Sequence, residues 1–395
     1  MVVAIKLMLM AAAFLMPFLP DMAGLLMMYS LVAVYLVNDI MNDHNEISKS
    51  NMDIPVILYL IIILISTLTS ISLIGSLRDL GLHLGGLSFV FVMVNSIKSK
   101  NVFNALVTVL VFSATVVALY GLYQYVVGVE IDDAWLDVEN NPDVRVRVYS
   151  VFHNPNILAE YLIMIIPLSV SLFWYTKKIS KKIVFLGTTL IMILAMLMTL
   201  SRGSWVGFAF SAFVFILLLE KRLLLLVVPI SLGAVYFLPQ SILNRIMSIG
   251  NFADSSIAYR FTMWEITMDI IRDYPIAGVG FGHLPFKQIF ETYIRTMPIY
   301  HSHNTYLQTA VEMGIPGLLA FLFLLFILFK YGILKLVKSE DRYIRILSAG
   351  ALSSLGGVLT HGMAENVLYL PRIIFTFWIV VGLILTLDRI RRYEV

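Results

Sequence analysis

The sequence predicts an all-α integral membrane protein with about twelve transmembrane helices, as its composition, its long apolar segments and its charge distribution indicate. Of its 395 residues, 59% are hydrophobic and 13% are charged, and the mean hydropathy of +0.89 is too apolar for a soluble domain. Repeated segments of about 18 residues or more with few charges are each long enough to cross a hydrocarbon core. The chain has no cysteine, which excludes disulfides and thiol catalysis.

The first predicted helix is retained rather than cleaved. It carries Lys6 and then an apolar stretch without a small-residue cleavage site, so a signal peptide is not expected. The predicted spans are residues 4–20, 22–38, 55–75, 79–97, 102–127, 152–174, 183–200, 203–219, 223–239, 304–329, 345–362 and 370–387. An even number of spans places both termini on the same side of the membrane.

The loops alternate in basic charge, and this pattern predicts that both termini are cytoplasmic. Clustered lysines lie in loops on one side, for example at 177–182 and 330–345, as the positive-inside rule requires. On the other side, Lys287 is the one lysine among basic residues that are otherwise arginines. Arginine binds carboxylates and phosphates through paired hydrogen bonds, so we expect the outer face to carry the polar chemistry. A net charge of +3 gives no indication of nucleic-acid binding, and none is expected.

Two of the predicted outer loops are long, namely the acidic loop 128–151 and the larger loop 240–303. The larger loop contains an apolar stripe at helical spacing, formed by Phe261, Trp264, Met268 and Ile271. This stripe predicts an amphipathic helix that lies on the membrane surface or caps the bundle. The glycines of GVGFG at 278–282 predict a flexible turn, and without a strand-to-helix unit around them they do not indicate nucleotide binding.

Two arginines in the predicted outer segments are candidate ligands for an anion. Arg202 lies in a short hairpin between hydrophobic helices, TLSRGSW at 199–205, where the small Ser204 leaves space for a ligand. A phosphate can also meet the free amides where the following helix begins. The alternative is an arginine that extends to the outer headgroups. Arg260 begins the predicted amphipathic helix, and its alternatives are a solvated face or a pair with Asp254.

A third candidate lies in the segment HSHNTYLQTAVEMGIPG at 301–317. Ser302 is the predicted N-cap, so that His303 and Asn304 occupy the first turn of the next helix. The positive end of the helix dipole disfavours imidazolium, and His303 is therefore expected to be neutral near pH 7 and able to act as a general base. The alternative is an interfacial histidine that only caps or hydrogen-bonds. His301 adds a second imidazole, but without cysteine, HExxH or a carboxylate cluster no metal site is expected.

Polar residues at two further helix ends are candidates on the same side. Asn154 and Asn156 lie in FHNPN at 152–156 and are either substrate ligands or turn and cap residues. His361 and Glu365 lie in HGMAEN, spaced by four residues, and are expected on one helical face as supporting residues of the site, with Arg372 following them. Such a set of cations and amides suits an anionic, lipid-borne substrate at the interface.

The second half of the chain resembles the superfamily of O-antigen ligases and O-antigen polymerases, which are bacterial membrane glycosyltransferases. The resemblance rests on SVFHNPNILAEYL, TLSRGSWVGF, YRFTMWEITMDIIRDYPIAGVGFG and HSHNTYLQTAVEMGIPGLLAF, in this order and spacing. It implies a GT-C-like membrane domain whose core is 151–395, including outer loop 240–303. Residues 1–150 would form variable amino-terminal helices and the first outer loop, within the same membrane domain.

The resemblance implies an activity and roles for the candidate residues. Members transfer a glycan from a polyprenyl diphosphate, usually undecaprenyl diphosphate, to a hydroxyl of an acceptor glycan at the outer face of the bacterial cytoplasmic membrane. Arg202 and Arg260 would hold the diphosphate and His303 would activate the hydroxyl, without metal or cofactor and with inversion at the anomeric carbon. Asn154, Asn156, Asn304 and Ser204 would assist substrate binding, and His301, His361, Glu365 and Arg372 would support them. A polymerase is slightly favoured over a ligase, because the outer loops are not rich in basic residues.

The alternative class is a secondary transporter or a flippase for lipid-linked glycans, since twelve helices with both termini inside is also a transporter layout. Three features argue against it. The loop between the second and third spans lacks the Gly-x-x-x-Asp-Arg pattern of major-facilitator proteins, the halves show no repeat, and charges are scarce at mid-membrane depth.

Overall fold

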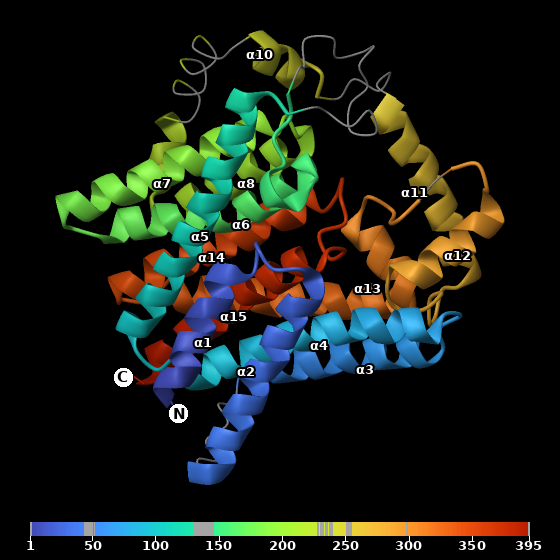
Figure 1. Cartoon of the computed structure of the whole chain (residues 1–395), viewed down its shortest axis with the longest axis horizontal. Coiled ribbons are helices and arrows are strands. Elements are labelled where there is room, and N and C mark those ends of the chain that lie inside the picture. Colours follow the sequence, from blue (N-terminus) through green and yellow to red (C-terminus); the bar gives the residue numbers. More distant parts are fainter. Residues whose placement is uncertain are drawn as a thin grey trace.

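The protein is built from helices joined by loops (Figure 1). The structure, a computed structural model, describes residues 2–42, 50, 52–129, 146–226, 229, 233, 236, 240–249, 255–297 and 299–393, and no strand occurs among them. The α-helices are α1 (Val2–Leu15), α2 (Asp21–Asn42), α3 (Asp53–Leu68), α4 (Leu73–Ser96), α5 (Lys100–Val127), α6 (Pro155–Tyr175), α7 (Ile179–Met198), α8 (Arg202–Leu219), α10 (Gln240–Met247), α11 (Ser255–Asp273), α12 (His283–Tyr293), α13 (Thr305–Tyr331), α14 (Arg342–His361) and α15 (Pro371–Tyr393). Shorter helical stretches are η2 (Ser150–Phe152), η3 (Lys221–Leu223) and the π-helical η4 (Gly332–Leu336).

Most of the predicted spans correspond to helices of membrane-spanning length. In the part of the chain that the structure describes, nine helices are long and apolar enough to cross a membrane, namely α2, α4, α5, α6, α7, α8, α13, α14 and α15. Helices α1 and α3 are apolar but shorter. The predicted span 223–239 lies largely outside the described residues. The prediction of a multi-pass, all-helical membrane protein is confirmed.

Helix α3 ends earlier than the predicted span 55–75, and the prediction of its end is wrong. A turn after Leu68 reverses the chain, and the hydroxyl of Ser70 stabilises it by accepting hydrogen bonds from the amide of Ser72 at 3.0 Å and the hydroxyl of Ser76 at 2.7 Å. Serine hydroxyls bond locally in this way at turns. Hydropathy alone cannot locate this turn because apolar residues continue on both sides of it.

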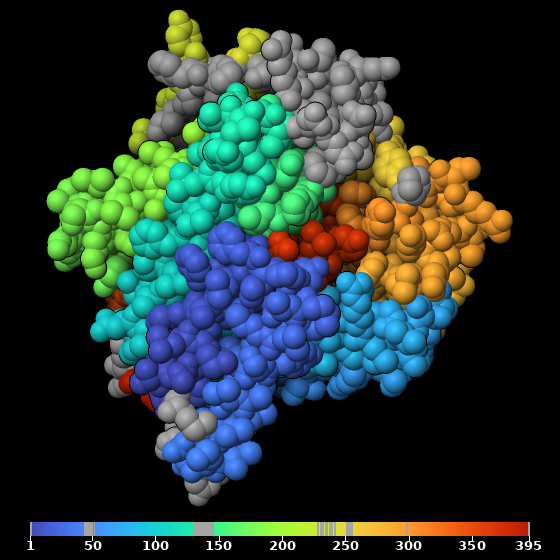
Figure 2. Space-filling model, in the orientation of Figure 1, coloured from blue at the N-terminus to red at the C-terminus, as the bar shows by residue number. Residues whose placement is uncertain are grey.

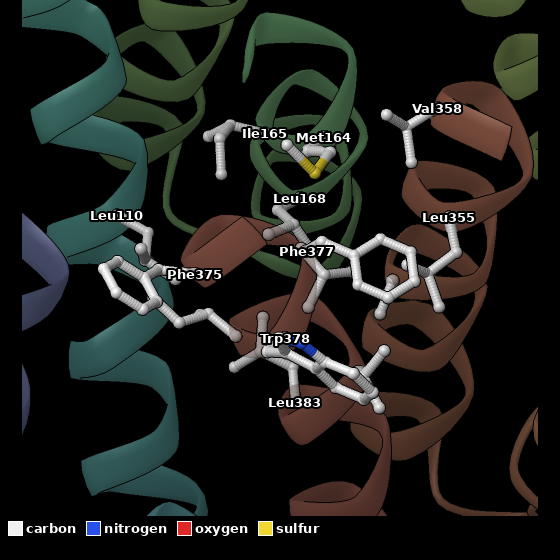
Figure 3. Close-up of a cluster of buried hydrophobic side chains, with 14 of the residues drawn as sticks. Leu110, Met164, Ile165, Leu168, Leu355, Val358, Phe375, Phe377, Trp378 and Leu383 are labelled. Atoms are coloured by element: carbon white, nitrogen blue, oxygen red, sulfur yellow. The ribbon is translucent and has the colours of Figure 1, made fainter. Parts of the chain in front are cut away.

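The centre of the bundle is formed by α6, α14 and α15, which are almost wholly buried. Figure 3 shows their side chains packed together: Met164, Ile165 and Leu168 from α6, Leu355 and Val358 from α14, and Phe375, Phe377, Trp378 and Leu383 from α15. Leu110 of α5 borders the same cluster. These helices therefore form a rigid support for the loops at their ends.

Helices α8 and α14 approach each other closely through glycines. A side chain added at Gly207 would lie 2.7 Å from the carbonyl oxygen of Gly357, and one at Gly203 would lie 3.1 Å from the imidazole of His361. Small residues allow such close packing of membrane helices. The contact fixes the first turn of α8, which begins at Arg202, against the last turn of α14.

Helices α11 and α12 lie together at the right of Figure 1, beside α13 and the start of α4. Met263 and Ile270 of α11 are fully buried in a cluster with Phe286 and Phe290 of α12. The predicted helix is present, but its buried face differs from the predicted apolar stripe. Phe261 and Met268 are exposed by 43% and 40%, whereas the fully buried side chains point to the other side of the helix.

The predicted glycine turn packs against an interruption in α13. At Gly314 the backbone leaves the helical conformation, with φ of 70°, and the amide of Ile315 donates to the carbonyl of Pro275 at 2.8 Å. Gly278 also has a φ of 70°, and a side chain there would lie 2.3 Å from the carbonyl oxygen of Glu312. Only glycine fits at this contact. The turn after α11 is therefore fixed to α13, where the sequence predicted a flexible turn and an uninterrupted span.

Candidate functional site

Glu365 connects several of the predicted site residues. It lies in the loop between α14 and α15, and its side chain is only 4% exposed. One carboxylate oxygen, Oε1, lies 2.6 Å from Nδ1 of His303 and 3.6 Å from Nδ1 of His301. The other oxygen, Oε2, accepts hydrogen bonds from Arg260 at 3.4 Å and from the side-chain amide of Asn156 at 3.3 Å. Residues from three other motifs therefore converge on one buried carboxylate.

The carboxylate of Glu365 is held in its ionised form. Burial alone raises the pKa of Glu365, but the adjacent imidazole of His303, followed by His301 and Arg260, more than offsets this and sets the pKa well below its usual range. An ionised carboxylate 2.6 Å from Nδ1 of His303 favours the tautomer that carries its proton on Nδ1. The other ring nitrogen, Nε2, then carries the lone pair. The side chain of His303 is 29% exposed, so a substrate can reach it.

The backbone places His303 outside the helix that follows it. Its φ is 49°, in the left-handed region, where a non-glycine residue costs roughly 1–2 kcal/mol. The N-cap of α13 is Asn304, whose side chain accepts from the amides of Tyr306 and Leu307, so the predicted N-cap at Ser302 is wrong. Strained backbone of this kind is concentrated at functional sites. In this conformation His303 turns toward Glu365 instead of continuing the helix.

Neighbouring contacts hold the loop before α13 in place. The indole of Trp264 in α11 donates to the carbonyl of Ser302 at 3.0 Å, and the amide of Ser302 donates to the side chain of Gln308 at 2.7 Å. The amide of His303 donates to Nδ1 of His301 at 3.2 Å. Helix α11 therefore supplies both Arg260 and a contact that positions the histidine loop.

His301 is buried and remains neutral. Burial lowers the pKa of His301 to about 3, and the positive charges of His303 and Arg260 act in the same direction, although Glu365 opposes them. A neutral His301 can accept the amide hydrogen bond of His303 through Nδ1, which a protonated ring cannot do. His301 thus supports the conformation of the loop rather than carrying charge.

We expect burial of His301 to lower the stability of the folded protein as the pH falls from 7 to 5. Below about pH 6.5 an unfolded histidine binds a proton, whereas folded His301, with its pKa near 3, does not. The free energy of unfolding then decreases by up to ~1.4 kcal/mol per pH unit. Because the pKa of Glu365 is lowered on folding, ionised Glu365 stabilises the fold above about pH 4.3. It therefore does not change the free energy of unfolding between pH 7 and pH 5.

Thermal unfolding of the detergent-solubilised protein at pH 7, 6 and 5 measures this slope. His301→Gln, which keeps a hydrogen-bond acceptor but cannot titrate, should flatten the fall in melting temperature. Equal slopes for the two proteins would show that His301 does not remain neutral.

Four arginines, Arg147, Arg202, Arg245 and Arg260, lie near enough to one another for their charges to interact. Arg147 donates to the carbonyl of Thr199 at 2.9 Å, and Arg245 of α10 donates to the carbonyl of Leu200 at 3.2 Å. Arg202 donates to the carbonyl and the hydroxyl of Ser248, at 3.2 and 3.3 Å. The hairpin before α8 therefore organises three guanidinium groups, and Leu200, with φ of 53°, turns its carbonyl toward Arg245.

The positive charges of these arginines act on one another. Burial, together with the positive charges of Arg245, Arg202 and Arg260, lowers the pKa of Arg147 to about 9. Arg147 also donates to Asn156 at 3.3 Å, which links the cluster to Glu365. An anion bound among the four guanidinium groups would relieve their repulsion and accept paired hydrogen bonds.

Arg147 and Arg245 were not singled out in the sequence. Arg147 follows Arg145 in VRVRV at 144–148 and Arg245 lies in ILNRIM at 242–247, and neither pattern is specific for an anion site. One signal was available for Arg147, because it shortly precedes the FHNPN motif that contains Asn156.

The other predicted site residues have structural partners. Asn154 caps α6 and accepts from the amide of Asn156 at 2.8 Å, and Asn304 caps α13 and donates to the carbonyl of Met363 at 3.0 Å. The hydroxyl of Ser204 is buried and donates to the carbonyl of Ser201 at 2.7 Å. Arg372 donates to the carbonyls of Pro17 and Val151, at 3.2 and 2.9 Å. Direct substrate contacts by these residues remain predictions.

His361 and Glu365 do not share a helical face, and this interpretation of their spacing is wrong. Helix α14 ends at His361, so Glu365 lies in the loop beyond it. The imidazole of His361 instead lies 3.3 Å from the carboxylate of Glu160 in α6, and both side chains are fully buried. His361 therefore connects α14 to α6 beneath the site.

Three of the described side chains lie close enough to share a metal ion. Ligand atoms of His301, His303 and Glu365 all lie within 4.8 Å of one another. Arg260 contacts the same carboxylate, and its positive charge would repel a divalent cation there. The expectation of a metal-free site remains a prediction and is tested below.

Comparison with known proteins identifies the family that the chain resembles. Residues 187–322 match the family model described as O-antigen ligase. The resemblance to this family is confirmed. The matched segment contains Arg202, Arg260 and His303, whereas Asn156 and Glu365 lie outside it. In addition, the "Exopolysaccharide production protein ExoQ" of Rhizobium meliloti (strain 1021) is 31% identical over 96 residues, which is 22% of this chain and 22% of that protein.

Proposed function

We propose that this O-antigen-ligase-like protein transfers a glycan from a polyprenyl diphosphate carrier to a hydroxyl of an acceptor glycan. The observation that supports the proposal most strongly is the position of Glu365 between His303 and Arg260, which joins a candidate base to a candidate anion site. A transferase of this kind needs a base for the acceptor hydroxyl and a binding site for the diphosphate, both within reach of the same anomeric carbon. The charge pattern of the loops supports a reaction at the extracytoplasmic face.

In this proposal His303 is the general base. Nε2 of His303 accepts the proton of the acceptor hydroxyl while the hydroxyl oxygen forms a bond with the anomeric carbon. The bond between that carbon and the diphosphate oxygen breaks, and its electron pair leaves with the diphosphate, so that the configuration inverts. Glu365 keeps Nδ1 of His303 protonated and stabilises the imidazolium that forms.

The arginine cluster stabilises the leaving group. Negative charge on the diphosphate increases as the bond to the sugar lengthens, and fixed guanidinium groups bind this developing charge more strongly than the ground state. Arg202 and Arg260 are the predicted ligands, and Arg147 and Arg245 lie near enough to contribute charge. Such a cluster can supply the positive charge that other glycosyltransferases obtain from a metal ion.

We favour a polymerase of an exopolysaccharide or O-antigen over a ligase. The printed name of the relative refers to exopolysaccharide production, and the predicted outer loops are poor in the basic residues that an anionic lipopolysaccharide core would attract. A polymerase uses a second lipid-linked glycan as the acceptor.

The test is to incubate the purified protein in nanodiscs with a lipid-linked oligosaccharide alone and to separate the products by electrophoresis. We expect a ladder of polymers, in the presence and absence of a chelator such as EDTA. A requirement for a different acceptor would indicate a ligase. Loss of activity in EDTA with recovery on adding a divalent ion would contradict the metal-free mechanism, and absence of transfer to any acceptor would contradict the proposal.

A further inference from the structure

A cavity beside the arginine cluster is not used by the chemistry proposed above. It has a volume of about 410 Å³ and lies between the end of α5, the segment before α6 and the start of α15. Ligand pockets in proteins typically measure about 300–1,000 Å³. The side chains that matter most for its chemistry are Tyr120, Tyr123, Tyr149, His153, Phe18 and Arg372. Figure 2 shows the surfaces of these regions meeting, with the blue first helices below the teal and green segments and the red surface beside them.

From this lining we propose that the cavity is a glycan-binding subsite, which binds sugar units of the substrate beyond the reacting one. The inference rests on the proposed glycan transfer. Tyrosine and histidine rings offer flat apolar faces for the C–H face of a pyranose, and their polar atoms and the guanidinium of Arg372 can bond sugar hydroxyls. A polyprenyl tail consists only of hydrocarbon and does not match such a mixed lining.

The length of α5 indicates that its tyrosines lie at or beyond the membrane surface. The helix has 28 residues, which at ~1.5 Å per residue gives a length of about 42 Å. A hydrocarbon core is only about 30 Å thick, so the last turns extend past it. Tyr120 and Tyr123 are exposed by 47% and 60%, and their rings stack at 6.2 Å with an angle of 18° between planes. They form an accessible aromatic surface on the side from which a glycan approaches.

The chain segment that lines the cavity also reaches the reaction centre. Arg147 and Asn156 belong to the cluster around Glu365, whereas Tyr149 and His153, between them in sequence, line the cavity with ring centroids 6.1 Å apart. One short segment therefore contributes residues both to the site and to the cavity. A glycan whose diphosphate lies among the arginines would have its next sugars close to these rings.

The backbone of this segment is strained, which is typical of functional loops. Ser150 and His153 have φ of 52° and 55°, in the left-handed region. Gln124 of α5 holds the strained part, accepting from the amide of Ser150 at 2.7 Å and from the amide of Tyr149 at 3.2 Å. The hydroxyl of Ser150 donates to the carbonyl of Val117 at 2.7 Å. These bonds fix Tyr149 and His153 at the edge of the cavity.

A role in the interfacial aromatic belt is the alternative for the tyrosines of α5. Tyr125 provides the matched control, because it lies on the same helix, is 50% exposed and does not line the cavity. A belt role predicts equal effects at all three tyrosines. A subsite predicts that KM rises when Tyr120 and Tyr123 are replaced and does not rise when Tyr125 is replaced.

The experiment compares Tyr120→Ala/Tyr123→Ala with Tyr125→Ala in nanodiscs, using lipid-linked oligosaccharide purified from the producing cells. We expect the double variant to raise KM on the order of tenfold, the effect of losing about one stacking contact, with kcat nearly unchanged. Varying donor and acceptor separately identifies which glycan occupies the cavity. Glycan-free undecaprenyl diphosphate should inhibit the double variant and the wild type equally, because it lacks the sugars.

A second measurement separates failure of the subsite from failure of the proposed function. Benzoylphenylalanine in place of Tyr123 should crosslink to free oligosaccharide released from the polysaccharide, whereas the same group in place of Tyr125 should not. Crosslinking at 123 without any transfer by the wild type would retain the subsite and overturn the transferase. Transfer with an unchanged KM, or equal effects at Tyr125, would overturn the subsite.

Discussion

Replacement of Glu365 by glutamine is expected to reduce the rate of glycan transfer by about 10³- to 10⁴-fold. The amide has nearly the same shape but no charge. It cannot keep Nδ1 of His303 protonated as the carboxylate does, nor stabilise the imidazolium that forms when the acceptor proton is taken. The measurement is kcat for polymer formation in nanodiscs, with thermal unfolding as a check that the variant folds.

Two controls make this prediction specific. Glu312→Gln makes the same change at another buried glutamate, whose Oε1 accepts from Gln308 at 2.8 Å and can still do so as an amide oxygen. We expect this variant to retain most of its activity. Residues that act as one unit give losses that do not add, so Glu365→Gln combined with His303→Ala should be hardly slower than His303→Ala alone. Additive losses would show that the two residues act independently.

The positions of the helices were largely predictable from the sequence, and their ends were not. A long apolar segment has one stable arrangement in lipid, which is a helix that satisfies its own backbone. Helix ends depend on single side chains. Helix α3 ends earlier than predicted, and Ser70 stabilises the turn that follows it. Asn304 rather than Ser302 caps α13, because His303 adopts a left-handed backbone. Neither effect has a signal in hydropathy.

The candidate site was predictable to the extent that its residues stand out individually. Arg202, Arg260 and His303 were conspicuous because charged or basic groups at the ends of apolar helices are costly and therefore informative. The role of Glu365 was not predictable, because its partner Arg260 lies 105 residues away along the chain. Its spacing of four residues from His361 predicted that the two side chains share a helical face. Helix α14 ends at His361, however, so Glu365 lies in the loop beyond it.

Arg147 and Arg245 show the same limit more strongly. Each gains its meaning only from the tertiary structure, where the hairpin carbonyls of Thr199 and Leu200 bring their guanidinium groups together. The strained backbone at Leu200, His303, Ser150 and His153 is equally invisible in sequence, because none of these residues is a glycine. Strain at four residues in three loops is a reason to expect that these loops are built for binding rather than for stability.

Replacement of Arg260 by alanine is expected to lower kcat by about 10²- to 10³-fold, because a fixed donor to the developing charge of the diphosphate is lost. Arg202→Ala should have an effect of similar size. Arg260→Lys should recover only part of the activity, since an ammonium group supplies charge but not the planar pair of hydrogen bonds. Release of polyprenyl diphosphate in single-turnover experiments measures the chemical step directly.

Arg272 provides the matched control for Arg260. It lies on the same helix, α11, but its side chain is 74% exposed and pairs with Asp269 on the surface. Arg272→Ala should therefore leave transfer unchanged, since exposed ion pairs contribute little. Arg202 discriminates further, because no contact with Glu365 is found for it among the described residues, whereas Arg260 touches this carboxylate. If Arg202→Ala were fully active while Arg260→Ala was not, Arg260 would act by holding Glu365 and not by binding the diphosphate.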